Sequence, residues 1–530
     1  MEWNLLRDRW IPVRLAGGGA ARVGPWEVCL PEVLAVDPPR PDFAGALLEF
    51  LIGLLSTAAM PADDDAWEDW LDRPPGPGEL KARLAPLEPY FNVLGDRPCF
   101  MQDLTLEPGP ARDHLPAAGL FIESPGDKTL SDNTDFFIKR GGVERLCPHC
   151  AALALYTLQT YSPSGGKGHR TSLRGGGPLT TLLTGPDLWR TLWKNVLPAD
   201  APGMQPAPSA DKLAGGVFPW AAATRTSEKA SPTEQTLPQD VHPLQMFWGM
   251  PRRILLLSET LEQEAACDLC ATRTRTVVEC YVTRPYGTNY KGPWEHPLTP
   301  YRSQGPEEPA LSLKGRSDGA RYKHWLGLVL GDPDDAKRPV RPALCVAQYR
   351  RARPGGDGAV QRVLAFGFDM DNAKARQWSE GEYPFYLAPE GQDETFRMEA
   401  ERWVRAADQA RRSLVGGIKE ALFGEGAKAD LDKTLLENTA VRFWAATEQP
   451  FYGLVQRLAG LLRESAGSTL EQRMDLRREW TKALLGQAVE LFHRDVEQEA
   501  FRADQAPRVY KALNRMRAFL KGGCAKILEI

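Results

Sequence analysis

The residues best suited to chemistry are four cysteines in two CxxC pairs, Cys147–Cys150 and Cys267–Cys270. A CxxC turn places two thiolates on one ion, and Zn²⁺ accepts four thiolates in a closed tetrahedral site with no open position. The alternatives are a redox motif and unpaired core cysteines, but a redox CxxC is expected beside a βαβ pattern, which neither pair has. The sequence therefore predicts a structural zinc site that joins distant segments through Cys147, Cys150, Cys267 and Cys270.

A basic, glycine-rich loop, Gly165–Gly177, follows the first pair. Its backbone amides could form a concave site for an anion, with positive charge from Lys167, Arg170 and Arg174. It is not a P-loop, because a glycine follows Lys167 where a Mg²⁺-binding hydroxyl is needed. The loop indicates nucleic acid rather than a nucleoside triphosphate, and a plain glycine turn is the alternative.

A second loop, just before the first cysteine pair, interleaves aromatic and basic side chains: Phe136, Phe137, Lys139 and Arg140. Aromatic faces can stack on unpaired bases while lysine and arginine hold the phosphates. In the alternative interpretation both phenylalanines are buried, as phenylalanine commonly is. The flanking glycines favour an exposed loop that contacts nucleic acid.

Catalytic signatures do not accompany these motifs. The seven histidines form no HExxH motif, and the chain has no GxSxG segment. The acidic residues show no recognisable metal-nuclease spacing. The pattern indicates a binding protein that is not an enzyme. A zinc-containing nucleic-acid enzyme and a structural scaffold remain as alternatives.

Composition sets the class of protein. With 530 residues, 42% hydrophobic and a net charge of −4, the chain is a balanced globular protein of more than one domain. Its basic residues gather locally, between Lys139 and Gly177 and near the C-terminal end. Scattered cysteines fit a reducing compartment, and the N-terminal residues lack a signal-peptide pattern, which predicts a cytoplasmic protein. The apolar window Phe43–Met60 contains Glu49 and is expected to be a buried helix rather than a membrane span.

Residues 1–390 are expected to form a large, irregular α+β domain that positions these motifs. Strand-like runs are short, and helical windows intervene. The segment Asp200–Gln239 is rich in proline, alanine, serine and threonine and is predicted to be a mobile loop. The predicted strands are Val277–Val282, Leu344–Tyr349 and Val363–Phe368.

Residues 391–530 are predicted to form a four-helix bundle, because apolar residues recur there at three- and four-residue steps. The last helix would carry Arg508, Lys511 and Arg515 on one face. That face is either solvated or in contact with phosphates. The four expected apolar stripes are Phe396, Ala400, Trp403, Ala407, Ala410 and Leu414; Phe451, Leu454, Leu458 and Leu461; Trp480, Leu484, Ala488 and Leu491; and Tyr510, Leu513, Met516 and Phe519 or Leu520.

The order of these motifs resembles a known family, CasA, the large subunit of the type I-E CRISPR surveillance complex Cascade. The resemblance rests on the opening Asn4–Arg14, the two CxxC pairs, and the segments Leu173–Thr181, Trp294–Pro297 and Gly367–Lys374. It covers nearly the whole chain. It implies a subunit bound to crRNA and other Cascade subunits. Such a subunit recognises the protospacer-adjacent motif (PAM) of double-stranded DNA, mainly through the minor groove, promotes duplex opening, and helps recruit the helicase–nuclease.

The resemblance also implies roles for particular residues. The family's glycine loop corresponds to Thr171 and Ser172. Its basic minor-groove finger corresponds to Arg284, with Lys291 as the alternative. The remaining matches are the base-pair wedge, Asp371, Asn372 and Ala373; the loop to crRNA and PAM, Phe136, Phe137, Lys139 and Arg140; and the zinc ligands, Cys147, Cys150, Cys267 and Cys270.

Overall fold

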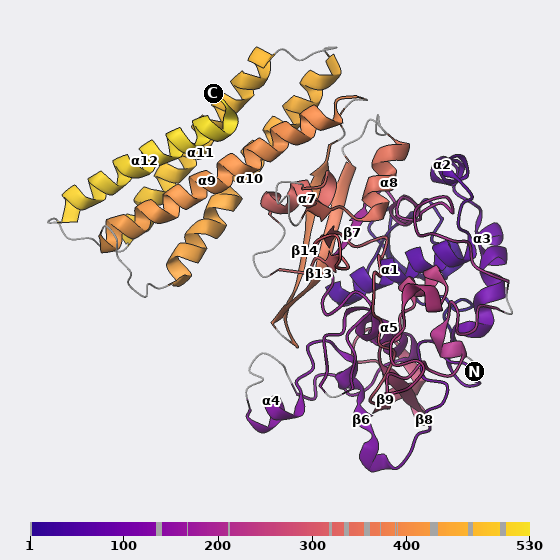
Figure 1. The fold of residues 1–530 in the computed structure, drawn as a ribbon. Helices are drawn as coiled ribbons and strands as arrows, with labels where there is room; N and C mark the ends of the chain where they lie inside the picture. Colours follow the sequence, from indigo (N-terminus) through magenta and orange to yellow (C-terminus); the bar gives the residue numbers. More distant parts are fainter. Residues whose placement is uncertain are drawn as a thin grey trace. The chain divides into compact units, whose positions relative to one another are not determined.

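The computed structural model describes residues 3–133, 140–166, 168–209, 212–316, 321–332, 339–353, 361–371, 373–386, 388, 391–424, 433–464, 470–498 and 505–530. The chain divides into two compact units (Figure 1). The first comprises Met1–Gly319, Pro342–Ala352 and Val363–Gly381, and the second comprises Ala320–Arg341, Arg353–Arg362 and Glu382–Ile530. The last segment of the second unit thus begins shortly before the predicted boundary at residue 390. Residues 320–341 also belong to it, although the sequence pattern grouped them with the first domain.

The first unit mixes small sheets with helices, which confirms the predicted α+β class. Strand β2 (Ile11–Leu15) lies between β3 (Ala20–Val23) and β4 (Val33–Val36), and β1 (Trp3–Asn4) pairs with β5 (Asn92–Leu94). Strand β9 (Arg273–Arg284) lies between β6 (Leu115–Pro116) and β8 (Arg253–Ala266), and β10 (Tyr301–Arg302) pairs with β11 (Leu311–Ser312). Strand β13 (Gln361–Asp371) lies between β7 (Thr180–Leu183) and β14 (Lys374–Phe385). The helices are α1 (Pro41–Ala58), α2 (Asp64–Asp72), α3 (Pro77–Leu84), α4 (Asp127–Ser131), α5 (Pro148–Tyr161), α6 (Leu188–Trp193) and α8 (Leu344–Ala352).

Helix α1 runs through the core of this unit. Pro41 occupies its first turn, where a missing N–H does no harm, and nearly every following residue is apolar. Among the described helices, α1 alone is long and apolar enough to cross a membrane, but 83% of it is buried within the fold. The prediction of a buried core helix is therefore confirmed.

An aromatic cluster surrounds α1 and corrects one expectation. Phe50 makes edge contacts with Phe91, Tyr156 and Trp248. Trp220 joins the same cluster through Trp248 and is fully buried. Trp220 lies in Asp200–Gln239, so the prediction of a mobile loop there was wrong. Its few large apolar side chains outweigh the proline- and serine-rich composition, because each buries a large apolar area.

Leu344–Tyr349 is a second correction, because this segment forms the helix α8 and not a strand. Cys345, Val346 and Tyr349 are buried together. That spacing places all three on one face of a helix, whereas in a strand they would point to both faces. The other two predicted strands are confirmed within β9 and β13.

The second unit contains α7 (Trp325–Val329), β12 (Val340–Arg341) and the helices α9 (Asp393–Phe423), α10 (Lys433–Glu464), α11 (Leu470–Gln498) and α12 (Ala506–Leu528). The last four pack on one another as the predicted bundle (Figure 1). The predicted stripes of α9 and α11 are entirely buried. In α10, Leu462 is buried where Leu461 was expected.

The stripe of α12 is confirmed at Leu513, Met516 and Leu520, which is one of the two alternatives for the last position, and differs from the prediction at Tyr510. Tyr510 is 67% exposed and Phe519 is 63% exposed, whereas Leu513, Met516 and Leu520 are buried. The buried stripe continues through Cys524 and Leu528. It therefore follows smaller residues and leaves two aromatic rings in solvent.

Candidate nucleic-acid interface

The two cysteine pairs form one cluster in the first unit. All four Sγ atoms lie within 4.8 Å of one another, and those of Cys147 and Cys270 are 3.7 Å apart. Four thiolates around Zn²⁺ at the usual bond length require sulfur–sulfur separations of about 3.8 Å. Cys147 caps α5 and Cys150 lies in its first turn, while Cys267 and Cys270 lie in the turn between β8 and β9. The donor set and its spacing fit a structural Zn²⁺ that ties these two elements together.

The cluster thiols are close enough to form hydrogen bonds with one another, which shift their pKa values in opposite directions. Hydrogen bonds from Cys147 and Cys150 lower the pKa of Cys267 to about 6. The hydrogen bond between Cys150 and Cys147 is the main cause that raises the pKa of the Cys150 thiol. A bound divalent cation would remove these hydrogen bonds, because it holds all four sulfurs as thiolates.

Helix α5 and strand β9 run side by side from the cluster to the glycine loop. Leu146, just before α5, forms a bridge with Val278 of β9. The 14 residues of α5 extend about 21 Å, and extended chain from Val278 to Pro285 extends about 23 Å. The segments that follow these two elements meet, because the amide of Tyr286 donates to the carbonyl of Gly168 at 2.7 Å.

The glycine loop is fastened at the end of α5. The amide of Ser172 donates to the carbonyl of Ser162, and the amide of Gly177 donates to the carbonyl of Tyr161, both at 3.0 Å. Thr171 is exposed, but Ser172 is only 3% exposed and its hydroxyl donates to the Gly175 carbonyl at 2.6 Å. Of the two residues predicted to approach DNA, Thr171 is the one on the surface.

A buried ion pair supports the loop from below. The side chains of Arg174 and Glu49 are 3% and 1% exposed, and Arg174 Nη2 lies 2.5 Å from Glu49 Oε2. The hydroxyls of Thr180 and Thr299 each accept from Arg174 Nη1 at 2.9 Å. Burial alone would lower the pKa of Arg174, but Glu49 together with Tyr161, Tyr301 and Tyr156 outweighs burial, and the pKa is raised. The charge of Arg174, predicted to support nucleic-acid binding, is thus balanced by Glu49 inside the protein.

The carbonyl of Arg174 is also held. Ser312 Oγ donates to it at 2.5 Å and Lys314 Nζ at 2.7 Å. Because side chain and carbonyl are both fixed, the backbone between Ser172 and Gly175 has little freedom to move.

The predicted finger lies beside the first half of the glycine loop. Arg284 ends β9, is 43% exposed, and its Nη2 lies 3.1 Å from Asp113 Oδ2. A Cβ on Gly168 would come within 2.7 Å of the Pro285 side chain, so the two loops meet where only glycine fits. Lys291, the alternative cation, is exposed and follows a bridge between Thr236 and Tyr290.

The predicted wedge is the turn of the β13–β14 hairpin. Asp371 and Ala373 are exposed, and Asn372 lies outside the described residues. Arg376 on β14 pairs with Asp369 on β13 at 2.7 Å, which braces the hairpin near its tip. A cavity of about 330 Å³ beside this part of the hairpin is lined by Arg376 together with Arg40, Glu123 and Trp378.

The hairpin and the glycine loop are in direct contact. A Cβ on Gly177 would lie 2.5 Å from the carbonyl oxygen of Phe368 and 2.7 Å from the side chain of Met370. Next to this contact, β7 pairs with β13 from Thr180 to Leu183. The structure thus brings together the glycine loop, the finger and the hairpin, three elements far apart in the sequence.

Other predicted residues lie elsewhere or outside the described part of the chain. Phe136, Phe137, Lys139 and Lys167 are outside it. Arg140 is exposed, and its guanidinium donates to the Leu130 carbonyl and to Asn133 Oδ1. Arg170 donates to the hydroxyl and carbonyl of Ser227.

The basic residues of α12 belong to the second unit. Arg508 donates to the carbonyls of Ala421 and Leu422 at the end of α9, and Arg515 pairs with Glu420 at 2.9 Å. Lys511 is exposed. Two of the three predicted cations therefore stabilise the packing of α9 against α12.

Sequence reasoning missed the supporting residues Glu49 and Lys314. Glu49 carried a signal, because a charged residue within an apolar helix needs a buried partner. Nothing in the sequence near Lys314 marked it, since its contacts come from segments that the fold brings together.

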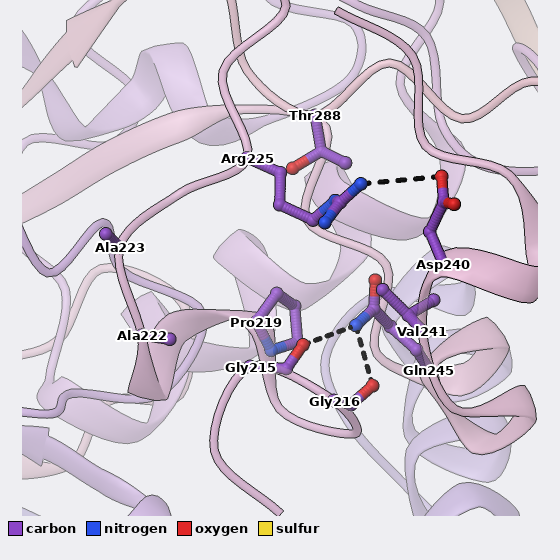
Figure 2. Close-up of a pocket in the computed structure, with 10 residues that line it drawn as sticks. All are labelled: Gly215, Gly216, Pro219, Ala222, Ala223, Arg225, Asp240, Val241, Gln245 and Thr288. Atoms are coloured by element: carbon purple, nitrogen blue, oxygen red, sulfur yellow. Dashed lines mark hydrogen bonds and ion pairs between the residues drawn. The ribbon is translucent and has the colours of Figure 1, made fainter. Parts of the chain in front are cut away.

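A further cavity, of about 290 Å³, lies in the first unit beside the loop that contains Gly215 and Gly216 (Figure 2). Gln245 donates to the carbonyls of both glycines, and Arg225 lies 3.4 Å from Asp240 across it. None of the predicted site residues that the structure describes line this cavity.

Comparison with known proteins identifies one family. The family model described as CRISPR-associated protein Cse1 matches residues 4–491. Cse1 of Acidimicrobium ferrooxidans is 17% identical with a TM-score of 0.71, and the match covers 99% of both chains. Cse1 of Thermobifida fusca is 18% identical with a TM-score of 0.71, over 99% of this chain and 98% of that one. A chain of a CRISPR RNA-guided surveillance complex is 17% identical with a TM-score of 0.64, over 98% of this chain and 99% of that one.

Proposed function

Because the chain belongs to the CRISPR-associated protein Cse1 family, we propose that it is the DNA-recognition subunit of a type I-E Cascade complex. A similar fold occurs in a CRISPR RNA-guided surveillance complex, which supports this assembly. In the proposal the subunit works in the cytoplasm, bound to crRNA and other Cascade subunits. It catalyses no reaction itself. It recognises the PAM, promotes opening of the target duplex and R-loop formation, and helps recruit the helicase–nuclease.

The observation that carries the proposal is the meeting of the three elements with predicted roles at the DNA. Gly168 touches the finger at Pro285, and Gly177 touches the hairpin at Phe368 and Met370. Around these contacts, Thr171, Arg284, Asp371 and Ala373 all have exposed or partly exposed side chains. A loop, a cation and a hairpin tip within one compact unit can act on one short stretch of duplex together.

Their chemistry suits the minor groove. The groove is narrow and offers acceptors in a degenerate pattern, so it is read by slender loops and arginine rather than by a helix. Thr171 offers a small hydroxyl, and Arg284 offers a planar cation held by a half-exposed pair with Asp113 and a hydrogen bond to the Thr283 carbonyl. A hairpin inserted at the edge of the PAM would unstack the adjoining base pair, and the exposed residues Asp371 and Ala373 at the hairpin turn suit that insertion.

The zinc in this proposal is structural. With Zn²⁺ bound, Cys147, Cys150, Cys267 and Cys270 would fix the start of α5 to the β8–β9 turn, and the opposite ends of both elements carry the reading loops. The four-helix bundle would hold the displaced strand and take part in recruitment, with Lys511 as an exposed cation on α12.

The test uses the assembled complex and duplex targets that differ only in the PAM. Arg284→Glu places a negative charge against the groove and should abolish PAM-dependent binding. Thr171→Asp should do the same without disturbing a buried side chain. Arg73→Glu, at the C-cap of α2 with its side chain 82% exposed, is the matched control and should bind normally.

Binding is measured by electrophoretic mobility shift, and folding by thermal melting of each purified subunit. Normal PAM-dependent binding by folded Arg284→Glu and Thr171→Asp complexes would contradict the assignment. Cleavage of labelled DNA by the isolated subunit with a divalent metal would contradict its non-catalytic role.

A further inference from the structure

Arg252, just before β8, lies directly against the glycine loop. Its Nη2 donates to the carbonyl of Pro163 at 2.5 Å. A Cβ on Gly165 would lie 2.3 Å from its Nη1, so the guanidinium occupies the space that a side chain there would fill. Its own amide donates to Gln159 Oε1 on α5 at 2.9 Å, which fixes the backbone from which the side chain extends.

The charge of Arg252 has no acidic partner among the described residues. Neighbouring arginines do have one: Arg253 pairs with Asp103 at 2.6 Å, and Arg284 pairs with Asp113. Arg252 Nε is buried without an acceptor. Burial lowers the pKa of Arg252 to about 10, so the side chain is still charged at neutral pH. A desolvated charge without a counter-charge costs several kcal/mol, and an arriving anion removes that cost.

The guanidinium can still be reached from solvent. Arg252 is half-buried; among the described residues Nη1 has no acceptor, and it is not one of the buried unpaired atoms. On its other side, Gly287 packs against the Pro251 carbonyl and the Arg252 amide. Arg252 thus lies where the glycine loop and the finger loop approach each other.

We propose that Arg252 binds a phosphodiester group of the duplex DNA that lies on the glycine loop and the finger. This inference rests on the proposed function and adds a binding residue to it. Guanidinium is suited to phosphate because its N–H groups form charge-assisted hydrogen bonds in a fixed plane. A backbone contact carries no sequence information, so Arg252 supplies affinity and register to every PAM alike.

The test measures duplex binding by the assembled complex over a range of salt concentrations. Arg252→Gln should weaken binding roughly tenfold for all PAM sequences and leave the order of PAM preference unchanged. The salt slope is the slope of the logarithm of the binding constant against the logarithm of the salt concentration, and one lost phosphate contact makes it less steep by about 0.9. The affinity lost between about 50 and 200 mM salt therefore becomes about 3.5-fold smaller. Arg252→Lys keeps the charge and should keep most of the slope. Arg73→Gln is the matched surface control and should change neither quantity.

Each outcome separates this inference from the proposed function. If Arg252→Gln leaves affinity and slope unchanged while Arg284→Glu abolishes PAM-dependent binding, the inference about Arg252 is overturned and the proposed function stands. An equal loss at every salt concentration indicates a purely structural role and also overturns it. Poorer incorporation into the RNA-containing complex, with normal DNA affinity, assigns the phosphate to guide RNA and overturns it as well. If neither variant has an effect, the proposed function fails too.

Discussion

Each of the two units buries an arginine–glutamate pair, and the two pairs hold different kinds of structure. In the first unit, Arg174 and Glu49 support an irregular loop. In the second, Arg477 on α11 pairs with Glu399 on α9 and also donates to the Leu528 carbonyl at the end of α12. The bundle pair joins regular helices that already pack through long apolar stripes. The loop has no such stripe, so its shape depends far more on polar contacts and on glycine.

Metal removal should have the largest effect and should act on one unit. Zinc contributes about 10–16 kcal/mol to small zinc-binding peptides, although a large unit with its own core depends on it less. Removing zinc from purified protein with a chelator should expose α5 and the β8–β9 hairpin. The bundle helices should remain protected. Hydrogen–deuterium exchange of peptides from each unit gives the readout.

Cys150→Ser should reproduce that pattern, and elemental analysis should find less than one zinc per chain. Cys280→Ser, on β9 but outside the cluster, is the matched control and should keep the metal. A zinc-free protein with wild-type protection throughout would show that the cluster is not a metal site.

Glu49→Gln should have the next largest effect, because it leaves Arg174 buried without a counter-charge. Breaking a buried pair in this way costs roughly 3–5 kcal/mol. Glu399→Gln should cost less, since Arg477 keeps Glu529 within 3.8 Å. Urea denaturation measures both losses in free energy of unfolding. We expect Glu49→Gln to lower PAM-dependent binding in the assembled complex and Glu399→Gln to preserve it. Equal effects on binding would remove the distinction between the two pairs.

A pH dependence of stability should arise from Lys314, which supports the glycine loop. Burial, with the nearby charge of Arg174, lowers the pKa of Lys314 to about 7. In the unfolded chain the pKa of lysine is about 10.4. Between about pH 7 and 10.4 the unfolded state therefore binds more protons than the folded state. The free energy of unfolding then rises with pH by up to about 1.4 kcal/mol per pH unit. Below about pH 7 the cost of burying the charged amine is fully present.

Lys314→Met should flatten this rise, as measured by urea denaturation across that pH range. Lys482→Met on α11 is the matched control in the bundle and should leave the wild-type dependence intact. An unchanged pH dependence in Lys314→Met would show that another group controls it.

The smallest expected effect concerns the aromatic rings of α12. Phe519→Ser should change the free energy of unfolding by no more than about 0.5 kcal/mol, because the ring is in solvent. Leu520→Ala, at the adjacent buried position, should cost roughly 2–5 kcal/mol. Thermal melting of both variants checks the order, and a larger loss for Phe519→Ser would show that Phe519, and not Leu520, belongs to the apolar stripe.

The bundle could be predicted because helical periodicity is a local signal. The stripes of α9 and α11 follow from residues three and four positions apart, and only in α12 did large aromatics mislead. The four cysteines could also be predicted, since CxxC spacing is itself the geometry of the site. The loop support could not be predicted in the same way. Glu49, Arg174 and Lys314 come from three distant segments, and whether Arg174 faces solvent or Glu49 depends on the completed fold.

Residues 320–341 matter when the helical part of this protein is produced as a separate fragment. Tyr322 stacks on Phe451 with ring centroids 4.4 Å apart, and the Trp325 indole N–H donates to the Pro384 carbonyl at 2.6 Å. Protease cleavage near residue 390 would leave helices α9–α12 without these aromatic neighbours. The fragment would present a fresh apolar surface around Phe451 and Trp480 and would tend to self-associate. A soluble fragment of this region therefore needs both pieces, with residues 320–341 supplied on the same chain or added as a peptide.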